Sequence, residues 1–541
     1  MRIRTTTLTR VGAAFLASTL LVTGCADSGG DKDNDKDKSE KSSMSKDEIW
    51  AGGVYGADDG GTPKDGGTLT VGDYGEPRSL DPTVTIPNGA VGASAMAAIY
   101  DVLMRWDDEA GAYVPQLAES LTSDDNTTWR LTLRKGVKFS DGTPVDAAAV
   151  MGSIGYYMSN QGFNTLLLYT NLSEMKPVDA TTIDFVMKAP WASFPAMLAT
   201  GPGMIVAPKA IAGGKDKFKP IGAGPFVFED YKPSEELVLT RNDDYFGERP
   251  HLDKLRFVWP ASDQARMDSL KRGDIDQASV RTPGVVEEAR TSGTAGALVP
   301  VGLGSMVWIN NREGRPGADE RLRKAMDLAF DPEAFLERTA DGHGIASRNI
   351  YTPSAPYYTE VTTPETNIAE AKKLVEEAKA DGVSTKLVYL GQSDQTSKTA
   401  AVTIQAMLEA AGFTVQVELL NNIADQTSRI YVTHDYDIAS SSMSIPVDDP
   451  YSRFSSQLIG ASPANPSGYS NPEMDKLIGS LQAATGEEAT SILTQINELW
   501  QETVPGIAIA PGGFFFPWNE NVHGILPSSE FLMLYHQAWK S

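Results

Sequence analysis

The chain has 541 residues, which is enough for two or more packed domains at roughly 100–200 residues each. With 41% hydrophobic and 22% charged residues, the composition is that of an ordinary soluble globular protein. The formal net charge of −24 argues against nucleic-acid binding, which needs a strongly basic face.

The N-terminus, residues 1–24, has the pattern of an export signal. Three arginines precede an apolar stretch at residues 11–22, which has the length of a signal-peptide core and is too short to span a bilayer. Small residues then lead into Cys25, the only cysteine, in a pattern that resembles a bacterial lipobox. The resemblance implies that Cys25 is diacylated and anchors the mature chain, whereas the alternative is an ordinary secretory signal with an incidental cysteine. No later segment offers ~18 uninterrupted apolar residues.

Residues 25–64 are predicted to form the lipidated cysteine and a disordered linker. Ser, Gly, Asp and Lys dominate this segment and large apolar residues are nearly absent. Such a composition buries too little apolar surface to offset the entropy of ordering the chain.

The first half of the folded region is predicted to be mixed in secondary structure. Alternating, β-prone residues indicate strands at 68–71, 128–133 and 254–259, and a short helix at 261–270. Residues 153–168 are mixed and predict no definite element.

From about residue 318 the sequence alternates between helices and strands. Leu322, Ala325, Met326 and Ala329 have the spacing of one buried helix face, and Asn367 is placed to cap a second helix. A strand is predicted at 386–390, a helix at 400–411 and a strand at 414–419. This order predicts a largely parallel sheet covered by helices, and hence an α/β second lobe. Ligands commonly lie between two such lobes, where a hinge closes around them.

Several segments resemble one family of bacterial solute-binding proteins. The most specific is WRLTLRKGVKFSDGTPV at 129–145, within a similar region at 99–154, and further matches lie at 220–226, 241–246 and 469–478. These segments resemble extracellular solute-binding protein family 5, which serves oligopeptide, dipeptide and nickel importers. The resemblance covers nearly the whole chain after residue 66.

The resemblance implies an α/β, two-lobe periplasmic-binding-protein-like fold (type II, peptide-binding class) with an extra subdomain inserted in lobe I. The expected boundaries are lobe I at 65–305 with the inserted subdomain at about 107–225, lobe II at 306–511, and a C-terminal return to lobe I at 512–541.

The function implied is that of the substrate-binding lipoprotein of an ABC importer. It would be a monomer at the outer face of the cytoplasmic membrane, would capture a peptide or peptide-like solute between its lobes, and would deliver it to a permease with a cytoplasmic ATPase. No cofactor, no metal, no nucleic-acid partner and no catalysis are expected.

The family's ligand loop, with the pattern G-W-x-x-D-x-x-D-P, resembles residues 442–450. Its first aspartate binds the peptide amine, but here Pro446 stands at that position and Met443 at the aromatic one. A proline side chain cannot neutralise a buried ammonium. Either Asp448 takes over this role or the ligand has no free amine there.

Other candidate ligand-binding residues follow the first strand or are aromatic residues able to stack on a ligand, although each aromatic is equally well explained as core. The full candidate set is Tyr74, Glu76, Trp308, Tyr351, Met443, Ser444, Pro446, Asp448, Phe454, Tyr469 and Phe514.

Three other functions remain open at this stage. An extracytoplasmic hydrolase is disfavoured because no G-x-S-x-G, H-E-x-x-H or phosphate-binding glycine loop is present. Capture of a metal through a chelating solute is compatible with the same fold, although the five histidines are scattered without ligand spacing. A lipid-anchored receptor or chaperone without transport is the third.

Overall fold

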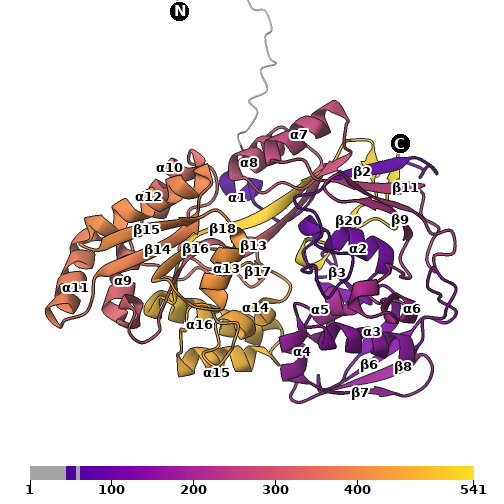
Figure 1. Ribbon diagram of the computed structural model, residues 1–541, viewed down its shortest axis with the longest axis horizontal. Helices are drawn as coiled ribbons and strands as arrows, with labels where there is room; N and C mark the ends of the chain where they lie inside the picture. Colours follow the sequence, from indigo (N-terminus) through magenta and orange to yellow (C-terminus); the bar gives the residue numbers. More distant parts are fainter. Residues whose placement is uncertain (1–43, 57–60) are drawn as a thin grey trace, which may run out of the picture. The chain divides into compact units, whose positions relative to one another are not determined.

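The computed structural model describes residues 44–56 and 61–541 (Figure 1). The predicted signal peptide and the lipidation of Cys25 lie outside these residues and stay predictions.

A five-stranded sheet carries the first of the predicted strands. Its order is β12 (Gln277–Ala278), β2 (Thr68–Gly72), β11 (Lys254–Val258), β10 (Glu236–Arg241) and β9 (Phe226–Lys232). β2 is parallel to both β11 and β12, and the other pairs are antiparallel. The segments between and after these strands include three helices, α2 (Ala93–Tyr100), α7 (Asp263–Arg272) and α8 (Pro283–Thr291). The predicted strands at 68–71 and 254–259 are confirmed, and the predicted helix begins two residues later because Ser262 caps α7.

A second, four-stranded antiparallel sheet is formed entirely within residues 118–187. Its order is β5 (Ala118–Thr122), β6 (Thr128–Leu133), β8 (Thr182–Met187) and β7 (Leu172–Pro177). The neighbouring elements are the hairpin β3 (Met104–Asp107) and β4 (Ala112–Pro115), and the helices α3 (Ala147–Ser159), α4 (Thr165–Asn171), α5 (Phe194–Met197) and α6 (Pro208–Ile211). The predicted strand at 128–133 is confirmed. Residues 153–168, for which the sequence predicted no element, belong mostly to α3 and α4. The sequence pattern was weak there because Gly152 and Gly155 lower the helix propensity of α3.

The third and largest sheet carries most of the second half. The order β1 (Gly53–Tyr55), β13 (Gly296–Ile309), β16 (Ile438–Ser441), β14 (Lys386–Gln392) and β15 (Thr414–Leu420) is joined by β17 (Ile445–Pro446) and β18 (Gly506–Pro517), which both pair with β13. Only the β14–β15 and β14–β16 pairs are parallel. The two strands predicted at 386–390 and 414–419 do pair parallel, as β14 and β15. The sheet as a whole is mixed and not largely parallel, because β13 pairs antiparallel with strands from distant parts of the chain.

The helices of the second half follow the predicted alternation more closely. They are α9 (Glu320–Ala329), α10 (Pro332–Ala340), α11 (Ile368–Ala380), α12 (Gln395–Ala410), α13 (Ile423–Tyr431), α14 (Pro450–Gln457), α15 (Pro472–Leu481) and α16 (Gly486–Thr503). Asn367 caps α11 as predicted, and its side chain accepts a hydrogen bond from the Glu370 amide. α12 begins earlier than predicted because Asp394 caps it.

Strands β13 and β18 run side by side for most of their length, and Figure 1 shows β18 in yellow along this path. Their pairing register shifts between Val301 and Ser305. At this shift Gly304 lies against Gly512, so closely that a Cβ on Gly304 would stand 2.4 Å from the Gly512 nitrogen. The predicted boundaries at 305/306 and 511/512 both fall inside these two strands, next to the register shift.

The N-terminal part of the described chain differs from the prediction. Residues 44–56 were expected to be disordered linker, but they form α1 (Lys46–Ile49) and β1, and β1 pairs with β13. Ser45 and Glu48 form a reciprocal capping box, and Ile49 and Trp50 are buried. The average composition of the segment is polar, which hides this short apolar core.

This segment, residues 44–56, contacts two distant parts of the chain. The indole nitrogen of Trp50 donates to Glu287 of α8 at 3.1 Å, and the ammonium of Lys46 donates to the carbonyl of Gly342 at 2.6 Å. The guanidinium of Arg290 lies 3.3 Å from the centre of the Tyr55 ring. The segment is therefore bound to both α8 and the loop after α10.

The C-terminal residues contact the five-stranded sheet. They form β19 (Val522–His523), β20 (Leu526–Pro527), β21 (Met533–Leu534) and β22 (Trp539–Lys540). The Tyr535 hydroxyl donates to Gln277 of β12 at 2.8 Å, and the Lys540 ammonium lies 2.7 Å from the Asp276 carboxylate. Across residues 44–56 and 61–541, no helix combines the length and apolar character that crossing a membrane requires.

Candidate functional site

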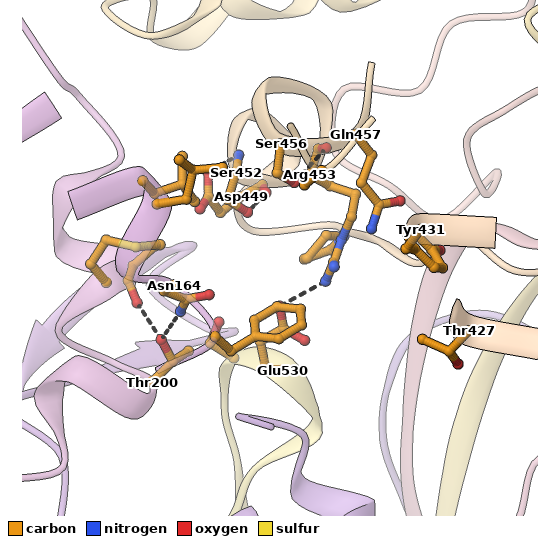
Figure 2. Close-up of a pocket in the computed structure, with 18 residues that line it drawn as sticks. Asn164, Thr200, Thr427, Tyr431, Asp449, Ser452, Arg453, Ser456, Gln457 and Glu530 are labelled. Atoms are coloured by element: carbon orange, nitrogen blue, oxygen red, sulfur yellow. Dashed lines mark hydrogen bonds and ion pairs between the residues drawn. The ribbon is translucent and has the colours of Figure 1, made fainter. Parts of the chain in front are cut away.

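A cavity of about 400 Å³ lies where three distant segments meet. The lining comes from residues 163–200 around α4 and α5, from residues 427–464 around α13 and α14, and from Ser529 and Glu530 near the C-terminus (Figure 2). Its volume is in the range that holds a small-molecule ligand.

A second cavity of about 890 Å³ adjoins the first, since Thr427 and Tyr431 line both. It follows β13 and β18 at their register shift and is also lined by α8 and by residues 440–444. Two consecutive residues near the C-terminus line different cavities: Glu530 lines the smaller and Phe531 the larger.

The smaller cavity contains an ion pair between Arg453 and Glu530. An Arg453 Nη2 atom lies 3.3 Å from Glu530 Oε1, with side chains 12% and 16% exposed. Figure 2 shows Arg453 reaching from α14 toward Glu530. Burial raises the pKa of Glu530, and the Arg453 charge opposes this rise. Glu530 is held in left-handed backbone, with φ of 52°, a conformation unusual for a residue with a Cβ.

A third ionisable group, Asp449, also lines this cavity. Its carboxylate accepts a hydrogen bond from the Ser452 amide at 3.3 Å and so caps α14. Burial, and then the charge of neighbouring Asp448, raise the pKa of Asp449 to about 7. Asp448 itself accepts a 2.6 Å hydrogen bond from the Tyr113 hydroxyl.

The rest of the lining combines polar groups with an apolar wall. Within the described chain, two buried atoms of this lining, Arg453 Nε and Gln457 Oε1, make no hydrogen bond. Leaving such a group unpaired costs about 1–3 kcal/mol. The apolar wall is formed by Phe163, Leu166, Leu167, Ala196 and Met197.

Three of the predicted ligand-binding residues line these cavities, and a fourth, Tyr74, lines neither but packs against one of the three. Pro446 lines the smaller cavity, and Ser444 and Phe514 line the larger one. Tyr74 packs edge-on against Phe514, with ring centres 5.6 Å apart. The Arg281 guanidinium lies 5.2 Å from the centre of the Tyr74 ring.

The other predicted residues line neither cavity. Glu76 accepts hydrogen bonds from the Tyr231 hydroxyl at 2.6 Å and the Ser234 amide at 2.9 Å, and Asp448 is engaged by Tyr113 as described. The remaining five are at most 3% exposed and belong to the hydrophobic core: Trp308, Tyr351, Met443, Phe454 and Tyr469. Their contact with ligand, expected from aromatic stacking and, for Met443, from the ligand-loop resemblance, stays a prediction.

Sequence reasoning did not select Arg453 or Glu530. Arg453 lies one helical turn after Asp449, so the ligand-loop motif extended by one turn of helix points to it. Glu530 carries no local signal, because its place in the cavity depends on the return of the C-terminal segment.

For residues 44–56 and 61–541, the structure contains no group of three or more His, Cys, Asp or Glu side chains able to hold a metal ion. The five histidines are not gathered by the fold into such a group.

Residues 112–464 match the family model described as bacterial extracellular solute-binding proteins, family 5 (middle). The chain belongs to this family. Among curated relatives, the probable D,D-dipeptide-binding periplasmic protein DdpA of Escherichia coli (strain K12) is 28% identical over 481 residues, covering 86% of this chain and 92% of that protein.

Solved structures show the same fold. The DppA periplasmic binding protein of Helicobacter pylori, in complex with the peptide STSA, superposes with a TM-score of 0.74 at 21% identity, over 88% of this chain and 98% of that one. NikA of Brucella suis, in complex with Fe(III)-EDTA, gives 0.74 at 22% identity, over 88% and 100%. The predicted α/β, two-lobe fold class of this family member is confirmed.

Proposed function

We propose that this family member is the substrate-binding lipoprotein of an ABC importer and that it captures a peptide or peptide-like solute. The observation that carries the proposal is the smaller cavity, which is lined jointly by residues 163–200, residues 427–464 and the C-terminal segment. A solute held there touches segments from both predicted lobes, so its binding energy favours the arrangement in which they are together.

The chemistry of the cavity supports a solute of this class. It offers one arginine, two carboxyl groups and several hydroxyl and amide groups beside an apolar wall. Peptides combine polar ends and a hydrogen-bonding main chain with apolar side chains, which is what such a lining pairs with. The relative DdpA carries the name of a D,D-dipeptide-binding protein, which favours a small peptide.

The proposal assigns a role to each region of the chain. Cys25 anchors the protein by lipid to the outer face of the cytoplasmic membrane, residues 65–305 and 512–541 form lobe I, residues 306–511 form lobe II, and residues 107–225 form the inserted subdomain. A permease with a cytoplasmic ATPase receives the solute from a monomeric, non-catalytic binding protein.

The test is mass spectrometry of solute retained by protein purified from residue 44 onward. We expect a peptide-like molecule bound one-to-one, returned unaltered after incubation. Adding it to the stripped protein should raise the melting temperature and reduce the radius of gyration in solution scattering. Turnover of the solute, or saturable binding restricted to another solute class, contradicts the proposal.

A metal chelate is a second candidate cargo, because the similar NikA structure contains Fe(III)-EDTA. Arg453 would pair with the carboxylates of such an anionic chelate. Metal analysis of the purified protein separates the two candidates: a peptide-binding protein contains no stoichiometric transition metal, whereas a chelate-binding protein loses its bound solute together with the metal.

A further inference from the structure

The Arg453–Glu530 ion pair joins two segments that are far apart in the sequence. Arg453 lies on α14, and Glu530 lies in the short turn Ser529–Phe531 near the C-terminus. Both side chains line the smaller cavity and both are largely buried. A buried pair of this kind costs desolvation that its own attraction repays only when the remaining donors and acceptors are also satisfied.

The pair leaves bonding capacity unused on both sides. A guanidinium has five N–H donors, and among the described residues the Arg453 guanidinium makes one hydrogen bond, from Nη2 to Glu530. Glu530 Oε1 accepts a hydrogen bond from Arg453 Nη2. A carboxylate can accept about four hydrogen bonds in all, so acceptor positions remain for a ligand. A ligand can therefore bind each partner without separating the two.

We propose that Arg453 and Glu530 together select a small zwitterion, with the ligand carboxylate on Arg453 and the ligand ammonium on Glu530. This inference rests on the proposed function and names the charge pattern of its substrate. The two protein charges and the two ligand charges then alternate in sign and share hydrogen bonds where both protein side chains are largely buried.

Charge balance favours a zwitterion over a singly charged solute. The protein pair is neutral, so adding a lone carboxylate or a lone ammonium leaves one net charge buried in the cavity. A zwitterion keeps the cavity neutral. With a cavity of about 400 Å³, a peptide of about two or three residues fits, its apolar side chain lying against Phe163 and Met197.

The same arrangement accounts for Pro446, which stands where the family's ligand loop carries an acidic residue. Pro446 lines the same cavity as Glu530. The negative charge absent from that loop is thus supplied from the opposite side, by the C-terminal segment. Asp448 is already bound by Tyr113, and Asp449 caps α14, whereas the one hydrogen-bond partner of the Glu530 carboxylate among the described residues is Arg453 of the same cavity.

The experiment measures binding by calorimetry to the protein from residue 44 onward and to four variants. The variants are Glu530→Gln, Arg453→Gln, Asp449→Asn and the control Glu418→Gln, which disrupts another Arg–Glu pair, with Arg429 at 2.6 Å, outside both cavity linings. The probes are di- and tripeptides of Gly, Ala, Leu and Phe, each as the free peptide, the N-acetyl form and the C-terminal amide.

We expect free peptides to lose at least about tenfold in affinity with Glu530→Gln and with Arg453→Gln, and to be unaffected by Glu418→Gln. The N-acetyl forms lack the ammonium and keep the carboxylate, so Glu530→Gln should not weaken their binding and should strengthen it, because the carboxylate then neutralises the unpaired Arg453. The amides lack the carboxylate and keep the ammonium, so for the same reason Arg453→Gln should not weaken their binding and should strengthen it. This pairing of variant with probe separates ligand contact from a merely structural role.

Three results overturn the inference. If each variant weakens all three peptide forms equally, the pair only supports the cavity. If Asp449→Asn and not Glu530→Gln removes the preference for a free amine, then Asp449 is the anchor. In both of these cases the proposed peptide-binding function stands, whereas wild-type protein that binds none of the peptides contradicts the function and the inference together.

Discussion

Replacing Trp50 with alanine should detach residues 44–56 from the rest of the protein. Trp50 is 6% exposed and belongs to a buried apolar cluster with Val286, Leu298 and Phe515. Its indole N–H donates to Glu287 Oε1, and the same carboxylate also binds the Gly344 amide at 2.6 Å. The substitution removes the largest side chain of the segment and one of the hydrogen bonds of Glu287.

The expected magnitude follows from the buried volume. Truncation of a buried tryptophan to alanine costs about 3–5 kcal/mol, and the lost hydrogen bond contributes about 1 kcal/mol to that cost. The segment is terminal in the described chain and can separate locally while the large sheet stays folded. At about 1.4 kcal/mol per tenfold change, the equilibrium for local opening should rise on the order of 100-fold or more.

Hydrogen exchange with mass spectrometry measures this opening directly. Exchange should accelerate at residues 44–56 and at the start of β13, which pairs with β1, and stay unchanged in β14 and β15. Val54→Ala is the matched control, since Val54 is in the same segment but 43% exposed. Equal exchange in the two variants, or fast exchange of this segment in the unaltered protein, refutes the reasoning.

Three further changes test other parts of the structure. Gly304→Ala places a Cβ against the backbone of Gly512 and should lower the free energy of unfolding, measured with denaturant, by about 1–3 kcal/mol. The control Gly155→Ala, in open space on α3, should leave stability unchanged or raise it. If the two substitutions change stability by a similar amount, β13 and β18 do not approach as closely as the structure shows. The pKa of Asp449 in the folded state, about 7, is higher than the ordinary 3.8, so burying this carboxyl costs the protein more stability as the pH rises from 3.8 to 7. Asp449→Asn should therefore raise the melting temperature more at pH 8 than at pH 5. A difference in melting temperature that does not depend on pH contradicts this prediction. Cys25→Ser should abolish incorporation of labelled fatty acid and release the protein from membranes, and persistence of the label shows that the acyl chain is elsewhere.

Local sequence patterns determined most of the individual elements. The strand at 128–133 and the cap at Asn367 depend on alternation and on one side-chain hydrogen bond, which are interactions between residues close in the chain. The family motifs were equally local, and they gave the fold class that the comparisons confirm. The sequence failed at 44–56, where Trp50 is buried by α8, more than 200 residues away.

The cavity and its charges were decided only by the tertiary structure. Arg453 and Glu530 are 77 positions apart and carry no shared pattern, yet the return of the C-terminal segment brings them to 3.3 Å. The antiparallel pairing of β13 with β18 likewise depends on segments some 200 residues apart, and a strand's own residues do not specify so distant a partner. The periodicity of the sequence predicts which face of a helix or strand is buried. Long-range packing decides which side chains from distant segments contact one another, and the cavity with its Arg453–Glu530 pair depends on such contacts.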